Sequence, residues 1–254
     1  MGTRIRTTLT VRSSPGLFTI STFMHHWLLA LGLGLFHSGV GPDPEKHFGE
    51  SYSAAVRMYQ KMEPIIQAEA RKNNLSPELM GAIIFPELIR YNRFRDLMET
   101  TALENIYVRF GKEKADFSIG PFQMKPSFVE MLEQRIKSDP AIAKSFAHLT
   151  VYPTQRAESI RRLRVERLSD PMWQTAYLAA FVTIAQHDYS IGSDTNEHQS
   201  LLLLATAYNR GIGTPREELE QLAQRKTFPY GRNMITGFSY YDVARHFHDN
   251  RSLK

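Results

Sequence analysis

The sequence of 254 residues predicts an all-α fold. From residue 49 onward, apolar residues recur at spacings of three and four, as at Val56, Tyr59 and Met62, which places them on one face of a helix. No stretch of strand length alternates between apolar and polar residues, so no β-sheet is expected. Helix-capping residues also stand at the start of several helical stretches. These patterns indicate a single body built of helices.

The individual helices follow from their caps and their periodicity. The segment Ser76-Pro77-Glu78 places an N-cap, a proline at the first helical position and an early acid in order, so a helix starts there. The expected caps of three later helices are Asp170, Thr214 and Ser239. Further helices are expected at 99–110, 125–137, 154–167, 171–188, 197–210, 215–225 and 239–248.

Two of these helices differ in character from the rest. Residues 172–184 are the most apolar, and this helix is expected to run through the core. Residues 155–167 carry several arginines and glutamates, which predicts a solvated, charged face.

The composition is that of an ordinary globular protein, with 42% hydrophobic and 22% charged residues. A chain of this length can bury a sizeable core. The net charge of +5 includes three arginines in residues 1–40, which hold no acid, so the remainder carries only +2. With no long block of like charge, a nucleic-acid partner is not expected. Cysteine is absent, which excludes disulfides, thiolate metal sites and a cysteine nucleophile.

The N-terminal segment predicts export. Residues 27–36 form a ten-residue apolar run, which is too short to span a bilayer but has the length of a signal-peptide core. Basic residues precede it and small residues follow it, although no A-x-A cleavage site is present. Residues 1–41 are therefore interpreted as a signal peptide, and residues 42–254 as the functional domain of a protein of the periplasm or cell envelope.

Two other interpretations of this segment stay open. Extended back to Gly16, the run reaches about 21 mostly apolar residues interrupted by His25 and His26, which is long enough for an uncleaved membrane segment. The segment would then attach the protein to the membrane. A buried core helix is the third interpretation.

Three short segments carry the candidate chemistry, and the first is residues 82–91. Here Glu87 lies at the end of a strongly apolar stretch. A carboxyl group in such surroundings is costly to ionise, so its pKa is expected to rise, as a general acid near neutral pH requires. The structural alternative is that Glu87 pairs with Arg90 or Arg93 on a solvated turn.

The other two segments contain features that suit a sugar-binding groove. Residues 118–126 combine a glycine turn at Gly120 with Gln123, an amide that can both donate and accept hydrogen bonds. Residues 205–211 end a helix with Tyr208, Asn209 and Gly211, where the tyrosine can stack on a sugar and the amide can bond it. Taken alone, the last segment is also an ordinary glycine C-cap.

In content and order, the three segments resemble the soluble lytic transglycosylases of the lysozyme-like superfamily. The resemblance spans residues 75–245 but rests on roughly twenty motif positions. It implies a helical lysozyme-like domain that cleaves the β-1,4 bond between N-acetylmuramic acid and N-acetylglucosamine in peptidoglycan glycan strands. It implies no cofactor and no metal, and one catalytic carboxyl, Glu87, with product ends of the 1,6-anhydromuramoyl type.

The same resemblance implies the roles of further residues. Those expected to form the groove wall beside the acetamido sugar are Gly120, Phe122, Gln123 and Met124. Tyr208 and Asn209 are expected to face them, with Asn209 orienting the acetamido group. A tyrosine that supports Glu87 is expected at Tyr240 or Tyr241.

The chain also departs from the family pattern. Leu88 stands where the family usually has serine, and Arg210 where it usually has alanine. Pro86 removes a helical hydrogen bond just before Glu87, so a kink or an early helix end is expected. The 33-residue gap from Glu87 to Gly120 is longer than usual and predicts a helical insertion over residues 96–116.

The insertion offers a candidate second carboxylate, which a hydrolysing muramidase needs in order to activate water. Asp116 is the first choice, although a simple loop acid explains it as well. His246 and His248 are two residues apart, which points them about 200° apart on a helix, so no metal site is expected there.

Two rival functions come from other classes. Leu88 and Pro86 fit a lysozyme-like domain without turnover that serves as a peptidoglycan-binding or envelope-scaffold protein. An unrelated helical protein that binds a partner is the second rival. It predicts that Glu87, Gln123 and Asn209 do not converge on one groove.

Overall fold

The computed structural model describes residues 43–94, 100–231 and 235–251, which belong to one compact unit, Val40–Lys254. Within these ranges the chain forms eleven α-helices, one 3-10 helix and no β-strand, which confirms the expected all-α fold. In this part of the chain, no helix is both long and apolar enough to cross a membrane. The predicted signal or membrane segment, residues 1–41, lies outside the described residues.

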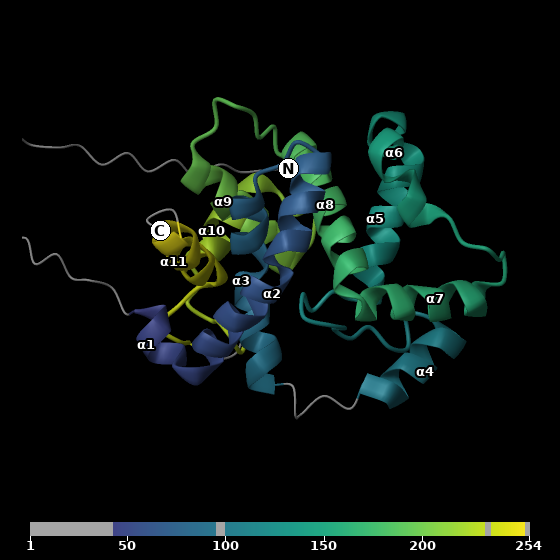
Figure 1. The fold of residues 1–254 in the computed structure, drawn as a ribbon, viewed down its shortest axis with the longest axis horizontal. Helices are drawn as coiled ribbons and strands as arrows, with labels where there is room; N and C mark the ends of the chain where they lie inside the picture. The colour runs from purple at the N-terminus through teal and green to yellow at the C-terminus, as the bar shows by residue number, and fades with distance from the viewer. Residues whose placement is uncertain (1–42, 95–99, 232–234, 252–254) are drawn as a thin grey trace, which may run out of the picture. The chain divides into compact units, whose positions relative to one another are not determined.

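The helices follow one another along the chain, and the longest connections lie between α4 and α5 and between α10 and α11 (Figure 1). Their bounds are α1 Pro44–Phe48, α2 Glu50–Lys72, α3 Pro77–Phe94, α4 Thr100–Phe110, α5 Pro126–Ser138, α6 Pro140–Phe146, η2 Ala147–Thr150, α7 Ala157–Ser169, α8 Pro171–Asp188, α9 Glu197–Arg210, α10 Arg216–Ala223 and α11 Tyr240–Arg251. Helices α8 and α9 have the expected bounds. Helix α6 was not expected, although Asp139 caps it by accepting from the amides of Ala141 and Ile142.

Side-chain caps begin several of the helices. The hydroxyl of Ser76 accepts from the amide of Leu79 at 3.1 Å, and Asp170 accepts from the amide of Met172 at 2.8 Å. Ser239 accepts from the amide of Asp242 at 3.1 Å and donates its own amide to the carboxylate of Asp242 at 2.6 Å, which forms a reciprocal capping box.

The expectation that Thr214 caps helix α10 was wrong. Pro215 is the N-cap residue and no side chain bonds the helix start. The hydroxyl of Thr214 instead donates to the carbonyl of Gly211 at 3.0 Å and so closes the turn that follows α9. The Thr214 hydroxyl thus bonds the preceding turn instead of an amide in the first turn of α10.

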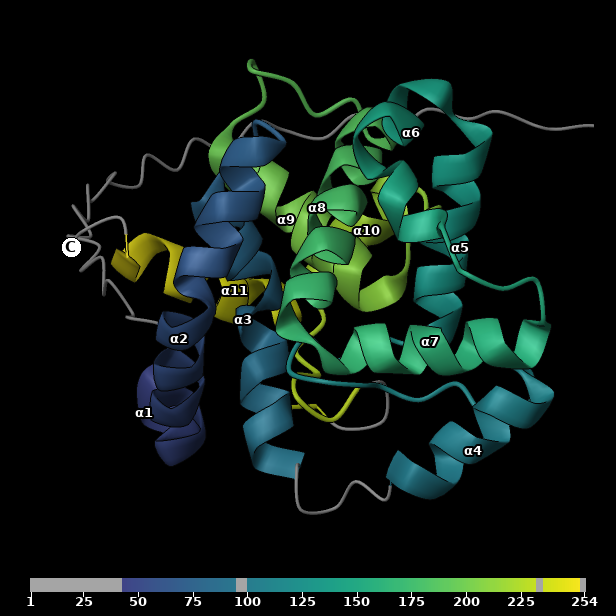
Figure 2. The same ribbon diagram turned by 45° about the vertical axis from the view of Figure 1, so that its right-hand side comes forward.

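Helix α3 lies between α2, α9 and α11, and α8 packs against α2, α5, α7 and α9 (Figures 1 and 2). Most apolar side chains of α8, including Leu178 and Phe181, are buried, and only Met172 at its start is largely exposed. This confirms that the helix runs through the core. Because α3 also contacts α8, its middle is enclosed by helices on several sides.

Helix α3 continues through Pro86 to Phe94, so the expected early helix end was wrong. An interior proline costs about 3 kcal/mol. Against this, Phe85, Leu88 and Ile89 are completely buried, and burying each such side chain contributes about 1.5–3 kcal/mol. Phe85 also stacks on Phe247 of α11 at a centroid distance of 3.8 Å. Tertiary packing therefore outweighs the local cost of the proline.

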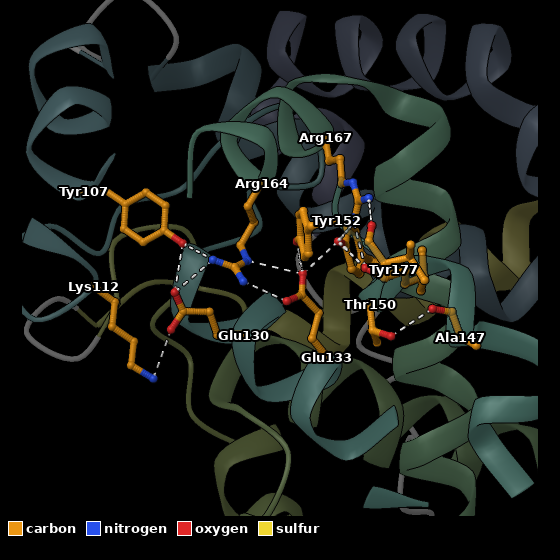
Figure 3. A network of polar contacts seen from close by, with 12 residues as sticks. Tyr107, Lys112, Glu130, Glu133, Ala147, Thr150, Tyr152, Arg164, Arg167 and Tyr177 are labelled. Carbon is orange, nitrogen blue, oxygen red and sulfur yellow. Dashed lines mark hydrogen bonds and ion pairs between the residues drawn. The ribbon is translucent and has the colours of Figure 1, made fainter. Parts of the chain in front are cut away.

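The charged helix α7 is only partly solvated, which corrects the expected charged face. Arg164 is 6% exposed and points inward, whereas Arg162 on the same helix is exposed. The guanidinium of Arg164 binds both oxygens of the buried Glu133 on α5, at 3.2 and 2.7 Å. It also donates to Glu130 of α5 and to the Tyr107 hydroxyl of α4, at 3.1 and 2.6 Å. This buried network ties α4, α5 and α7 together (Figure 3).

Candidate functional site

A cleft of about 430 Å³ opens where α3, α5 and the end of α9 meet the turn at residues 118–124. Its walls include Glu87, Gln123, Tyr208 and Asn209, which come from three separate parts of the sequence. Their expected convergence on one cleft is confirmed. The remaining lining residues are Arg90, Asp116, Ser118, Met124, Lys125, Ser127, Phe128, Met131, Arg210, Gly211 and Ile212.

Glu87 is the buried carboxyl group of this cleft. It is 5% exposed and follows a run of fully buried α3 residues. Burial raises the pKa of Glu87, while the charge and hydrogen bond of Arg90, a hydrogen bond with Tyr240 and the charge of Lys125 act to lower it. Burial outweighs these groups, so the carboxyl keeps its proton to a higher pH than an ordinary glutamate.

Arg90 lies one helical turn after Glu87 and fixes its carboxylate. Its Nη1 donates to Glu87 Oε1 at 2.8 Å and to Asn209 Oδ1 at 3.0 Å. Its Nε donates to the carbonyl of Pro229 at 3.2 Å, and the guanidinium lies 5.0 Å from the ring centre of Phe228. The Glu87–Arg90 pairing named as the structural alternative is therefore present, but in a buried setting rather than on a solvated turn.

The link from Arg90 to Asn209 was not foreseen, because it joins helices that are distant in the sequence. The spacing of three residues between Glu87 and Arg90 is the signal that indicated their pairing. The α5 residues Ser127, Phe128 and Met131 also line the cleft, and no motif singled them out. The sequence indicates only that these three residues begin a helix directly after the glycine turn.

Two tyrosines lie beside Glu87. The hydroxyl of Tyr240 donates to the carbonyl of Ile83 at 2.8 Å, and that of Tyr208 donates to the carbonyl of Phe122 at 2.8 Å. Burial first, and then the charge of Glu87, raises the pKa of both phenols well above the usual value, so both stay neutral.

Of the two candidates for a supporting tyrosine, Tyr240 is the one near the glutamate. Its hydrogen bond with Glu87 helps to lower the pKa of that carboxyl. The Tyr241 hydroxyl instead donates to the carbonyl of His198 at 3.4 Å. Neither tyrosine lines the cleft itself, but Tyr240 lines the pocket next to it. Neighbouring residues on a helix point about 100° apart, which explains why one faces the site and the other does not.

The glycine turn is built around Gln174 of α8. The side-chain amide of Gln174 donates to the carbonyl of Ile119 at 2.7 Å and accepts from the amide of Phe122 at 3.2 Å. Gly120 has φ +66°, and a Cβ added to it would lie 2.6 Å from Gln174 Nε2 and from the Leu168 carbonyl oxygen. Glycine is therefore required by close packing on α8 and by the backbone conformation.

The turn also corrects two of the expected groove residues. Gly120 faces Gln174 and Phe122 is completely buried, so neither lines the cleft. Gln123 and Met124 do line it. Gln123 has φ +52° and donates its Nε2 to the carbonyl of Gly120 at 2.8 Å, which orients the amide.

Asp116 lies in the same cleft as Glu87, yet both of its oxygens have partners. Oδ1 accepts from the amide of Ser127 at 3.0 Å, and Oδ2 accepts from the Ser127 hydroxyl at 2.8 Å. The ammonium group of Lys125 is 3.9 Å from Oδ2. Asp116 thus caps the start of α5, and its role as a second carboxylate stays a prediction.

No family model, curated protein or solved structure matches this chain. Among the described residues, no group of three or more histidines and carboxylates is arranged to hold a metal ion. His246 and His248 face different carboxylates, since His246 lies 3.7 Å from Asp43 and His248 lies 3.2 Å from Glu197. The cleft residues themselves are therefore the basis for assigning a function.

Proposed function

We propose that this protein is a lytic transglycosylase that cleaves the glycan strands of peptidoglycan with Glu87 as its single acid/base. The observation that carries the proposal is a buried carboxyl with a raised pKa at a cleft lined by amide and phenol side chains. A carboxyl that holds its proton near neutral pH is what a general acid for glycosidic cleavage requires. Since the substrate lies outside the cytoplasm, the proposal includes export to the periplasm or cell envelope.

In the proposed reaction, Glu87 donates its proton to the leaving oxygen as the bond between muramic acid C1 and that oxygen breaks. The substrate's own acetamido group stabilises the positive charge at C1. The Glu87 carboxylate then takes the proton of the muramoyl 6-hydroxyl as its oxygen bonds C1. Glu87 ends the cycle protonated, no water is consumed and the product carries a 1,6-anhydro end.

The amides in the cleft suit an acetamido sugar. Asn209 accepts from Arg90 through Oδ1, so the NH₂ group of Asn209 can donate to a carbonyl. Gln123 keeps its Oε1 as an acceptor, since its bond to Gly120 uses only Nε2. An N-acetyl group offers one carbonyl acceptor and one N–H donor, which these two side chains match.

A second candidate function is a lysozyme-like protein that binds peptidoglycan without turnover. The observation that favours it is Arg90, whose guanidinium holds both Glu87 and Asn209. Arg90 lowers the pKa of Glu87 and so offsets part of the effect of burial, which opposes general-acid catalysis. The two functions differ in whether muropeptides are released.

The test compares wild-type protein with Glu87→Gln, which keeps the shape of the side chain and removes the proton. Activity on purified peptidoglycan should fall by about 10² to 10⁴ while binding to the polymer is retained. Glu78→Gln is the matched control, because Glu78 is an exposed glutamate at the start of the same helix and lies outside the cleft. It should leave activity unchanged.

Mass spectrometry of the wild-type products identifies the reaction. 1,6-Anhydromuramoyl ends are about 18 Da, one water, lighter than the reducing ends left by hydrolysis. Reducing ends would replace the proposal with a hydrolysing muramidase and make Asp116→Asn the next variant. Binding of the polymer by a folded wild-type protein without release of fragments would establish the non-catalytic function instead.

A further inference from the structure

A second pocket, of about 220 Å³, adjoins the cleft. It shares Arg90, Asn209 and Arg210 with the cleft, so the hydrogen bond between Arg90 and Asn209 lies where the two meet. Its other lining residues are Thr206, Leu222, Ala223, Arg225, Thr227, Phe228, Gly231 and Tyr240. A substrate that fills the cleft can therefore extend a side group past Arg90.

The charge of this pocket is uniformly positive among the residues that are described. Three guanidinium groups, those of Arg90, Arg210 and Arg225, line it together with no carboxylate. Arg90 is paired with Glu87, and Arg210 lies 3.7 Å from the half-buried Glu218. Arg225 is exposed and forms no ion pair with any described residue. Such a set is arranged to receive an anion, and guanidinium groups are well suited to carboxylates.

The wall of this pocket also includes Thr206, which has a buried hydroxyl without a partner among the described residues. It is 3% exposed, and its hydroxyl has no hydrogen-bond partner in the described structure. A buried hydroxyl normally has a partner, and a threonine in a helix usually donates to the carbonyl four residues earlier. The hydroxyl of Thr206 does not do so, and the residue lies in the wall of the arginine-lined pocket.

We propose that this second pocket binds a carboxylate group of the substrate, held by Arg210 and Arg225 with Thr206 beneath. The inference rests on the proposed function, because in peptidoglycan the muramoyl sugar bears a peptide that carries free carboxylates. With the sugar chain in the cleft beside Glu87, the peptide branch has the adjoining pocket within reach. The pocket thereby selects glycan strands that carry peptides over bare strands.

The test measures binding of a disaccharide peptide, N-acetylglucosaminyl-N-acetylmuramic acid with its peptide attached, to wild-type protein. This probe lacks the bond that the proposed reaction cleaves, so binding is separated from turnover. It is used in two forms, with the peptide carboxylates free or converted to amides. The free acid should bind about tenfold more tightly, the difference expected from one charge-assisted hydrogen-bonded contact at a partly exposed site.

Two variants test which arginines bind the carboxylate. Arg225→Gln, which changes the second pocket alone, should reduce the affinity for the free acid toward that for the amide and leave the amide affinity unchanged. Arg210 also lines the cleft, so Arg210→Gln should weaken binding of the free acid more than binding of the amide. Arg162→Gln is the matched control, since it removes an exposed arginine of α7 that pairs with Glu158 outside both pockets. Equal wild-type affinities for the two forms would overturn the inference, as would an equal loss for both forms in the pocket variants.

Failure of this inference is distinguishable from failure of the proposed function. Cleavage of peptidoglycan without selectivity for the free acid would leave the function standing and reject the carboxylate pocket. Selective binding of the free acid by a protein that releases no muropeptides would support the pocket and reject the catalytic function.

Discussion

Replacing Arg164 by methionine should destabilise the protein strongly, because it leaves a buried carboxylate without its cation. The side chains of Arg164 and Glu133 are only 7% and 5% exposed, and their closest contact is 2.7 Å. Breaking a buried pair of this kind from one side costs about 3–5 kcal/mol. For a protein of this size, each kcal/mol lowers Tm by about 2–4 °C, so a fall of roughly 6–20 °C is expected. Glu133 keeps only the hydroxyls of Tyr152 and Tyr177 as donors.

The measurement is equilibrium unfolding in denaturant, followed by circular dichroism, with Arg164→Met, Glu133→Leu and the double variant forming a cycle. Because the double variant leaves no unpaired charge of this pair, it should be more stable than the sum of the single losses predicts, by roughly 1–3 kcal/mol. The exposed Arg162→Met should change stability by less than about 0.5 kcal/mol. A loss below about 1 kcal/mol in Arg164→Met, or an additive cycle, would refute the reasoning.

The remaining predictions concern the cleft and its supporting turn. Arg90→Gln removes the cation that lowers the pKa of Glu87, so this pKa rises. In the proposed reaction Glu87 is active as a general acid when protonated, so the alkaline limb of the kcat/KM profile should move to higher pH. The limb should stay in place in Arg93→Gln, and a move to lower pH in Arg90→Gln would contradict the proposal. Gly120→Ala should lower the free energy of unfolding in denaturant by about 1–3 kcal/mol more than Gly49→Ala does. Both glycines have positive φ, but only Gly120 has a backbone atom within 3 Å of the added Cβ. Equal losses would show that the turn relaxes around the added methyl group.

The helices and many of their starts are readable from the sequence because they depend on neighbouring residues. Apolar periodicity and caps such as Ser76 and Asp170 act within one or two turns of chain, so helices α8 and α9 were predicted with their correct bounds. Of the two outcomes expected at Pro86, the early helix end was wrong, because burial against α2 and α11 outweighs the cost of the proline.

The candidate site was only partly predictable for a related reason. Glu87, Gln123, Tyr208 and Asn209 stand out as residue types in unusual local settings, and their convergence was expected from a resemblance in motif order. The failure of Phe122 to reach the cleft was not predictable from the motif, because a turn can present either face. Its direction depends on Gln174, which is more than fifty residues away in the sequence.

Sequence patterns thus establish which segments are helical and which carboxyl has apolar neighbours on its own helix. Packing between helices establishes the rest. It places Arg90 against Asn209, turns Arg164 inward toward Glu133, and brings arginines from α3, α9 and the segment after α10 around one pocket. These charged side chains look alike in the sequence, since an arginine on a helix can extend into solvent or fold against a partner. Only the position of a partner from a distant segment decides between a solvated charge and a buried ion pair.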